Sequence, residues 1–438
     1  MKLYDENSIE QFGHLSLEPE ETSNRCHATV IIEASIVDAI YRELSLAQQE
    51  HAQPAGFGNH PPLNYIQQEY HIHLAEQVKE FLFKFFVINF FYKELRTRKI
   101  LLAQEPRLID IEIDTQGNMH VMFEITICPN IVMQEWKYLP FKAPRRKRYK
   151  DLDRQVEFFL AEEDEHLKQH QDTTIAIDDW VYFDIILADS HNKILLEQHQ
   201  EPFWLKIGNE EADHPFQDLF LGKTIGETFF TKHEALQDYF NEQATSLFNF
   251  FITIKDIVPN AFVCSNQIKK QFRIKTNKEL HQKIIEIFSY RNDISLRRNT
   301  IEEAYLLLLS RNSFSLSHSL MLRHQDLLLE MMQNNPDYMV YKTQKNFKHY
   351  IEKLAEKQIR ESLITEQIAY DENLAISDED VKNYLNLLKR SRTREFIYFQ
   401  PPTSKSQGQE LPLPAEELKT TCLREKALNY ILYHLTKK

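Results

Sequence analysis

The sequence predicts a multidomain protein of the α+β class, in which two β-containing modules precede a long helical body. The 438 residues include only eight glycines, and none lies between Gly226 and Gly408. Between Pro259 and Pro401 the only proline is Pro336. Because glycine and proline interrupt helices, a stretch that nearly lacks both is expected to be helical. The β-rich runs all lie before residue 260.

The composition excludes several classes of function. With 52 Lys and Arg against 65 Asp and Glu, the formal net charge is −13, which argues against general nucleic-acid binding and against DNA as a partner. No apolar run reaches the roughly 18–20 residues of a membrane-spanning helix, and the acidic first residues do not resemble a signal peptide. The four cysteines form no CxxC pair, which suits a reducing compartment, so we expect a cytoplasmic protein. No motif indicates a cofactor or a metal site.

The first third of the chain predicts a mixed head. In order, we expect a strand at 26–34, a helix at 35–52, a second helix at 63–93 and a β-hairpin at 107–127. Ser35 followed by Asp38 predicts a capping box at the start of the first helix. In the hairpin Ile109, Ile111 and Ile113 alternate with polar residues, which predicts one apolar face before a turn around Gly117.

The remaining segments differ in composition. Charge runs between residues 140 and 171 predict a solvated linker helix, and residues 172–258 are again β-rich. From residue 260 the apolar residues recur at helical spacing, and Ser377 with Asp380 predicts a new capped helix. Residues 399–417, rich in proline and polar residues, are expected to form a loop before a final helix.

Four segments, in order and at matching spacing, resemble the trigger factors, the bacterial ribosome-associated chaperones. They are HATVIIEASIVDAIYREL (27–44), GFGNHPPLNYIQQEY (56–70), FWLKIGNEEADHPFQDLFLGKTIGETF (203–229), which is similar to the FKBP-type motif, and the arm-like pair NLAISDEDVKNYL (373–385) and CLREKALNYIL (422–432). The resemblance covers most of the chain.

The resemblance implies a domain order and a function. It implies an α+β ribosome-binding head (1–139), a linker helix (140–171), an FKBP-like domain (172–258) and an elongated helical C-terminal domain with arms (259–438). It further implies an ATP-independent chaperone that holds nascent or newly made chains in an open state near the ribosome and assists folding and export. The implied partners are the ribosome and unfolded polypeptides, and no cofactor is implied.

The resemblance also implies a ribosome-docking tip. Its residues here are Gly56, Phe57, Gly58, Asn59 and His60, where the family has a Phe-Arg-Lys core. Because the two cations are missing, we expect ribosome binding that is weaker and less sensitive to salt. Two alternatives stay open: the tip is an ordinary surface turn, or docking has moved to the basic run at 145–148.

The implied prolyl-isomerase pocket is only partly aromatic in this chain. Its candidate residues are Phe203, Phe216, Tyr239, Phe250 and Ile194. Ile194 stands where the family has an aromatic residue, and Asp213 stands where the family has an apolar floor, so a carboxylate there must find water or a partner. We therefore expect isomerase activity to be weak or absent, and these aromatic residues can equally be ordinary core.

Three further interpretations remain. The Met and Leu residues of 319–333 are candidates for client contact, although such a stripe is more often core. His166 and His170, one helical turn apart, are more readily explained as a solvated pair than as metal ligands. As alternatives to a general chaperone, the chain is mainly a prolyl isomerase, or it is an assembly or scaffold protein that holds one partner.

Overall fold

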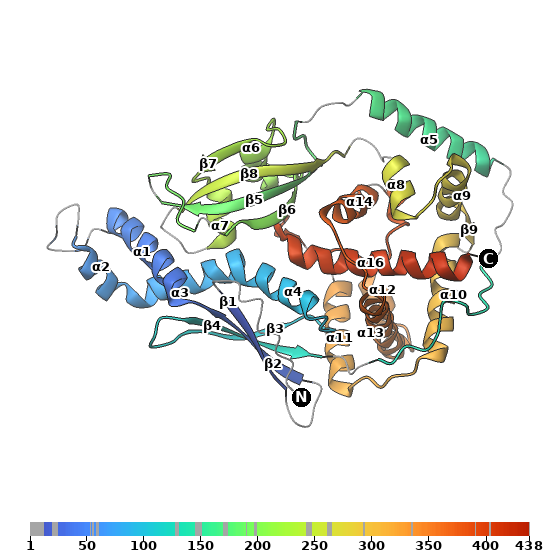
Figure 1. The fold of residues 1–438 in the computed structure, drawn as a ribbon, viewed down its shortest axis with the longest axis horizontal. Coiled ribbons are helices and arrows are strands. Elements are labelled where there is room, and N and C mark those ends of the chain that lie inside the picture. The colour runs from blue at the N-terminus through green and yellow to red at the C-terminus, as the bar shows by residue number, and fades with distance from the viewer. Residues whose placement is uncertain are drawn as a thin grey trace.

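The computed structural model describes most of the chain. The described residues are 13–19, 25–52, 54, 57, 61–127, 131–144, 151–169, 174–189, 191–196, 199–241, 248–260, 265–291, 294–333, 336–389, 391–402 and 404–437. The fold is mixed, as the sequence predicts: the described residues form a four-stranded sheet, a five-stranded sheet, two short two-stranded sheets and a large helical part (Figure 1). Within the described residues, no helix is long and apolar enough to cross a membrane.

The head contains a four-stranded antiparallel sheet with the order β1, β2, β4, β3. The strands are β1 (Gly13–Pro19), β2 (Arg25–Ile32), β3 (Arg107–Ile113) and β4 (Met119–Thr126). The predicted hairpin is therefore confirmed, but its strict alternation is not. A β-bulge between Leu108 and Asp110 leaves Ile109 exposed, so the apolar face of β3 is shorter than the pattern predicts.

The first head helix, α1 (Ala34–His51), begins one residue earlier than predicted. Its N-cap is Glu33, which makes no capping bond with its side chain, so the predicted box of Ser35 and Asp38 is wrong. The free backbone N–H of Ala34 instead donates to Oδ1 of Asn118 at 3.1 Å, from the turn of the β3–β4 hairpin. A tertiary contact therefore satisfies a donor that a local cap was expected to satisfy.

The second predicted helix is divided into four pieces. They are α2 (Leu63–Glu69), α3 (His71–Leu82), the π-helical turn η1 (Phe83–Val87) and α4 (Ile88–Thr97). The pieces α3, η1 and α4 run on as one rod, and its apolar residues lie in the same buried cluster as the sheet of the head. A π turn changes the direction in which side chains leave the helix.

The linker helix is α5 (Leu152–Gln169), and it packs against α9 of the helical body. The middle module, residues 174–258, contributes four strands to a five-stranded antiparallel sheet with the order β13, β6, β5, β8, β7, and β13 (Leu413–Pro414) comes from the segment before the final helix. Its own elements are β5 (Trp180–Ala188), β6 (Glu201–Lys206), η2 (Glu211–Asp213), α6 (His214–Phe220), β7 (Thr228–Thr231), α7 (Glu234–Phe240) and β8 (Asn249–Val258).

The helical body follows. Its elements are α8 (Ser265–Gln271), α9 (Asn277–Phe288), β9 (Tyr290–Arg291), β10 (Ile294–Ser295), α10 (Leu296–Arg311), α11 (His318–Gln333), α12 (Tyr338–Lys342), α13 (Phe347–Asp371), α14 (Asp378–Leu388), α15 (Ser391–Arg394) and α16 (Ala415–Thr436). The capping box of Ser377 and Asp380 is present at the start of α14, which confirms that prediction.

The segment before α16 is more ordered than the predicted loop. It contains β11 (Lys405–Ser406), β12 (Gln409–Glu410) and β13 (Leu413–Pro414). Strand β13 pairs with β6, so Leu413 lies opposite Trp204 and Pro414 lies opposite Phe203. We call residues 404–414 the clasp, because they join the C-terminal end of the chain to the edge of the middle sheet.

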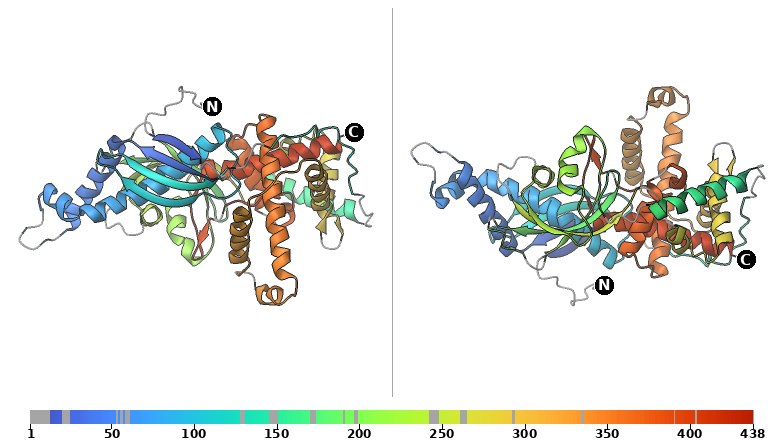
Figure 2. Two further views of the ribbon diagram at one scale, coloured as in Figure 1. Left: turned by 90° about the horizontal axis from the view of Figure 1, so that it is seen from below. Right: turned by 90° about the horizontal axis from the view of Figure 1, so that it is seen from above.

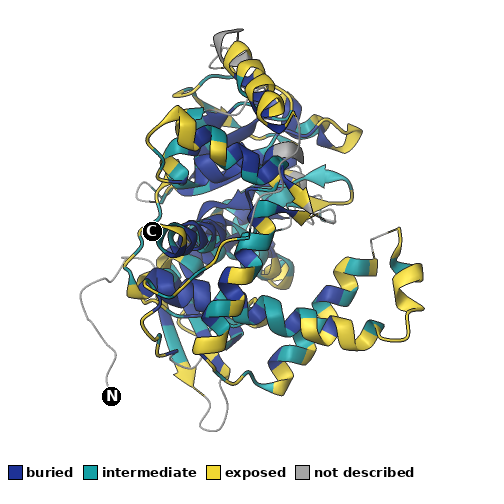
Figure 3. Cartoon of the chain, turned by 90° about the vertical axis from the view of Figure 1, so that its right-hand side faces the viewer, coloured by how far each residue is buried: buried dark blue, intermediate teal, exposed yellow. Residues whose placement is uncertain are grey.

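One helical hairpin stands away from the rest of the molecule. Helices α11 and α13 pack along each other and are joined at their far end by α12 (Figure 2). We call residues 318–371 the arm. Leu328, Ile351 and Ala355 form the small buried cluster inside it. Figure 3 shows that the far end of the arm is mostly exposed, whereas the centre of the molecule is buried.

Candidate functional sites

The rod of the head lies on the aromatic end of the middle module. The ring centroid of Phe81 is 4.1 Å from that of Phe248 and 5.7 Å from that of Phe240. Phe85, one helical turn further on, meets Phe240 edge-on at 5.4 Å. Offset and edge-to-face pairs at such distances add to the gain from burial. The two domains therefore share one continuous apolar core.

Polar contacts fix the same interface at its margins. Asn241 Nδ2 donates to the backbone carbonyl of Gln77 at 3.4 Å. At the other end of the rod, Asn89 Nδ2 donates to Glu201 Oε2 at 3.0 Å, and Asn89 Oδ1 accepts from the backbone N–H of Glu416 at 3.2 Å. Asn89 thus connects the head, the middle module and the start of α16.

An ion pair reinforces this junction. Arg96 on α4 pairs with the carboxylate of Glu416. Burial works against the charge of Glu416, but Arg96 and Lys419 outweigh it and keep the pKa of Glu416 below its usual value. Glu416 is therefore ionised at neutral pH.

Four of the five predicted pocket residues meet in that shared core. Phe203, Phe216 and Phe250 are buried, and Tyr239 packs against them while partly buried. Burial raises the pKa of Tyr239 well above its usual value. Ile194 lies apart from this cluster, next to the turn after β5, where it forms an isolated bridge with Ala188. The ring of Phe81 stacks on the Phe250 side of the cluster at 6.5 Å.

The arm presents the opposite kind of surface. Its far end exposes large apolar side chains in the last turn of α11, in α12 and in the first turn of α13. The exposed fractions are 70% for Met331, 69% for Met339, 63% for Val340 and 61% for Tyr350. The Met and Leu stripe predicted from the sequence is divided, because Leu328 is buried within the arm while Leu322 and Met331 are exposed.

Comparisons with known proteins agree on one family. The model of the bacterial trigger factor C-terminus matches residues 263–433. The trigger factor of Geobacter metallireducens is 22% identical over 390 residues, which is 85% of this chain and 86% of that protein. The trigger factor of Geotalea uraniireducens is 20% identical over 326 residues, or 70% and 73% of the two chains.

The chain resembles the trigger factors over most of its length at low identity, and the family model matches its C-terminal part. A solved chain described under "Promiscuous Substrate Recognition in Folding and Assembly Activities of the Trigger Factor Chaperone" aligns over 96% of this chain and 99% of its own, at 14% identity and a TM-score of 0.35.

The tip that corresponds to the family's docking loop is described at one residue. Phe57 is 40% exposed, and its ring lies 4.5 Å from that of Tyr65 on α2. Gly56, Gly58, Asn59 and His60 lie outside the described residues, as does the basic run at 145–148. The described part of the tip therefore offers one half-exposed aromatic ring.

The candidate metal pair cannot be placed, since the side chains of His166 and His170 lie outside the described residues. Within the residues that the structure does describe, no group of three or more His, Cys, Asp or Glu side chains is arranged to hold a metal ion.

Asp213, the carboxylate at the expected pocket floor, has found partners in the backbone. Its Oδ2 accepts from the N–H of Glu210 at 3.0 Å, and its Oδ1 accepts from the N–H of Glu410 in the clasp at 2.7 Å. Only glycine fits at Gly208, because a Cβ there would lie 2.0 Å from Asp213 Oδ2. Asp213 therefore holds the clasp onto the middle module.

Two features of this site were not predicted from the sequence: the packing of Phe81 and Phe85 on the middle module, and the hydrogen bond from Glu410 to Asp213. Phe81 and Phe85 are simply apolar positions of an amphipathic helix in the sequence, and nothing local indicates that they cover another domain. The Asp213 substitution was a usable signal, because a buried carboxylate requires donors. The donor from Glu410 comes from a segment that the sequence predicts as a loop.

Proposed function

We propose that this protein is an ATP-independent holdase that keeps nascent or newly made polypeptides in an open state in the cytoplasm. The exposed apolar end of the arm is the observation that carries the proposal. Apolar patches of this kind on a protein surface mark contact sites for other chains. Methionine suits varied partners because its unbranched side chain adapts its shape.

The test is suppression of aggregation of chemically unfolded model proteins. We expect the triple variant Met331→Ser, Met339→Ser, Tyr350→Ser to need at least fivefold more protein than the wild type for the same suppression. The matched control is Val132→Ser with Phe158→Ser, since these side chains are 83% and 69% exposed but lie outside the arm.

Two outcomes would contradict client binding by the arm, and a third would contradict the holdase itself. Equal suppression by the arm variant and the wild type would remove the arm from client binding. An equal loss in the control variant would mean that general surface apolarity, not the arm, is responsible. A single stoichiometric partner in pull-downs, without suppression for unrelated clients, would favour the scaffold alternative.

We also propose that the head docks on the ribosome through the tip that carries Phe57. The half-exposed ring on Tyr65 supports this, because an aromatic residue at a loop tip can insert into an RNA-rich surface without charge. Co-sedimentation with 70S ribosomes should be lost in the Phe57→Ala, His60→Ala double variant. Wild-type protein that stays in the supernatant at near-physiological salt would show that docking has been lost.

The isomerase alternative is disfavoured by the contact between the head and the middle module. A prolyl substrate needs an open aromatic pocket, whereas Phe81 already packs against Phe248 and Phe250. We expect no acceleration of cis–trans exchange in a short Xaa-Pro peptide. Rapid turnover that disappears in the Phe216→Ala variant would instead make isomerisation the main activity.

A further inference from the structure

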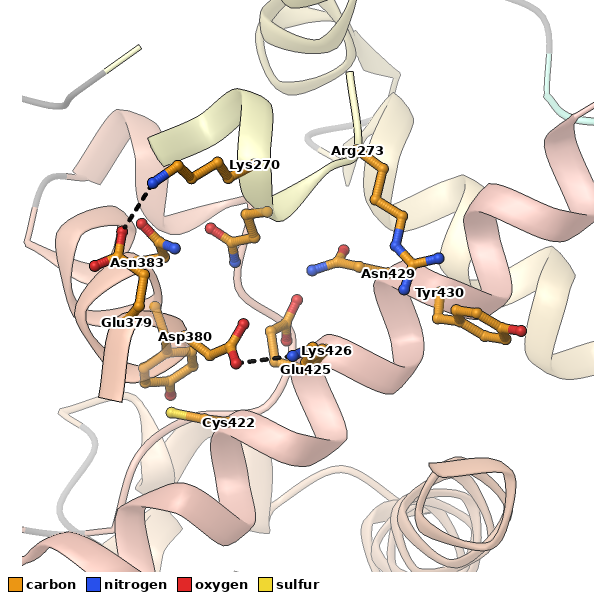
Figure 4. A pocket seen from close by; sticks show the side chains of 12 residues that line it. Lys270, Arg273, Glu379, Asp380, Asn383, Cys422, Glu425, Lys426, Asn429 and Tyr430 are labelled. Carbon is orange, nitrogen blue, oxygen red and sulfur yellow. Dashed lines mark hydrogen bonds and ion pairs between the residues drawn. The ribbon is translucent and has the colours of Figure 1, made fainter. Parts of the chain in front are cut away.

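A polar cavity lies between α8, α14 and α16 in the helical body, far along the chain from the head (Figure 4). Its volume is about 170 Å³. The side chains of Lys270, Arg273 and Glu379 are exposed at its rim, so the cavity opens to solvent. A liquid water occupies about 30 Å³, so the space exceeds that of one or two waters.

Three carboxamide groups lining the cavity have a buried atom without a hydrogen-bond partner in the described protein. These atoms are Gln271 Oε1, Asn383 Oδ1 and Asn429 Nδ2. Asn383 is 4% exposed and Asn429 is 8% exposed. Buried polar groups are normally hydrogen-bonded, so these three need water or a ligand in the cavity as a partner.

The orientation of Asn429 is set by a charged neighbour. Arg297 Nη2 donates to Asn429 Oδ1 at 2.7 Å, which leaves the NH₂ group of Asn429 as the free donor. The other two side chains, as placed, offer carbonyl oxygens. The free groups are therefore two acceptors and one donor.

The charges around the cavity are largely compensated within the protein. Lys426 Nζ lies 2.8 Å from Asp380 Oδ2, and Lys270 Nζ lies 3.6 Å from Glu379 Oε1. Glu425 is paired with the buried Arg297 at 3.3 Å. The guanidinium of Arg273 lies over the ring of Tyr430 at 4.8 Å, at the rim. A neutral occupant fits such a lining better than an ion, which would have to displace these pairs.

We propose that this cavity binds a primary carboxamide, such as the side chain of an asparagine or glutamine in a polypeptide. A primary carboxamide has two N–H donors and one carbonyl acceptor, which complement the two free acceptors and one free donor. This inference rests on the proposed function in one respect: a client polypeptide supplies the carboxamide.

The test is an NMR titration of the full chain with three small probes: acetamide, N-methylacetamide and acetate. Acetamide should bind saturably and at least fivefold more tightly than acetate, which has no N–H donor. N-methylacetamide, with one N–H, should fall between them. The probes need no client, so failure here is distinguishable from failure of the holdase.

Two variants remove the acceptors without breaking a described hydrogen bond. Asn383→Leu should abolish acetamide binding, and Gln271→Met, at a half-buried position, should weaken it at least threefold. Gln344→Met, which makes the same chemical change on the exposed end of the arm, should leave it unchanged. Folding of each variant is checked by its Tm.

Three outcomes would overturn the proposal. The first is acetamide binding that both cavity variants leave unchanged, and the second is acetate binding as tightly as acetamide. The third is no saturable response to any probe, which would make the cavity a site for water alone.

Discussion

The interface between the head and the middle module and the far end of the arm are built from similar side chains in opposite states. At the interface, the rings of Phe81 and Phe85 are covered by those of Phe240, Phe248 and Phe250. On the arm, Met331 and Met339 are about seven-tenths exposed. Apolar composition therefore does not tell which of the two surfaces meets other proteins. The difference is whether another part of the same chain covers it.

The same contrast bears on the resemblance to an isomerase pocket. The aromatic residues that match an isomerase pocket are retained, yet they belong to a core shared with the head. Retention of an aromatic side chain is equally explained by packing within the chain. Removing side chains should therefore lower stability at the interface and should lower client binding on the arm.

Removing a ring from the covered surface should be costly. Phe81→Ala should lower the free energy of unfolding by about 3–5 kcal/mol, because a buried aromatic is replaced by a cavity. Urea unfolding measures this, with Phe158→Ala as a control at a side chain that is 69% exposed. A loss below about 1 kcal/mol would show that the head does not depend on this contact.

Releasing the clasp from the middle module should lower the free energy of unfolding by less than Phe81→Ala does. Asp213→Ala removes the acceptor of the backbone N–H groups of Glu210 and Glu410, at about 0.5–1.5 kcal/mol for each lost hydrogen bond. Amide exchange in residues 404–414 should become faster. Asp218→Ala, one exposed carboxylate on α6, is the control. Unchanged amide exchange in residues 404–414 would show that Asp213 does not hold the clasp on the middle module.

The stability contributed by the base of the arm, where Glu361 lies on α13, should depend on pH. Burial raises the pKa of Glu361 to about 7, although Tyr398 donates a hydrogen bond to it and Lys357 lies nearby. The folded state thus binds more protons than the unfolded state between about pH 4.5 and 7. Stability contributed by this group should therefore fall as pH rises through that window, by roughly 1–3 kcal/mol, and then level off.

Comparing the wild type with Glu361→Gln isolates this group. The stability difference between pH 5 and pH 8, from urea unfolding, should shrink in the variant. Glu352→Gln, at an exposed carboxylate of the same helix, should keep the wild-type profile. An unaltered profile in Glu361→Gln would mean that Glu361 titrates normally.

Substitutions on the exposed end of the arm should change stability least. The variant Met331→Ser, Met339→Ser, Tyr350→Ser should change the free energy of unfolding by no more than about 0.5 kcal/mol, because exposed side chains contribute little to it. Urea unfolding of this variant, set beside its loss of client holding, gives the sharpest contrast with Phe81→Ala. A large loss of stability would show that the end of the arm is packed in solution.

The sequence predicted what depends on nearby residues. The box of Ser377 and Asp380, the β3–β4 turn and the helical body beyond residue 260 all follow from local patterns. The cap expected at Ser35 was wrong because Asn118, distant in sequence, supplies the acceptor. The same reason applies to the candidate pocket and to Asp213. Phe81, which packs against the pocket aromatics, and Glu410, which donates to Asp213, each come from a segment distant in sequence.

The clasp also constrains the order in which this protein reaches its final form. Strand β6 (Glu201–Lys206) precedes the helical body in the sequence, whereas its edge partner β13 (Leu413–Pro414) follows most of that body. A ribosome synthesises the chain from the N-terminus, so the middle sheet gains its fifth strand only after helices α8 to α15 have been made. Until then β6 is an open edge, the kind of strand that pairs with other chains. A protein proposed to hold unfinished chains thus has an open strand of its own until a segment distant in sequence covers it.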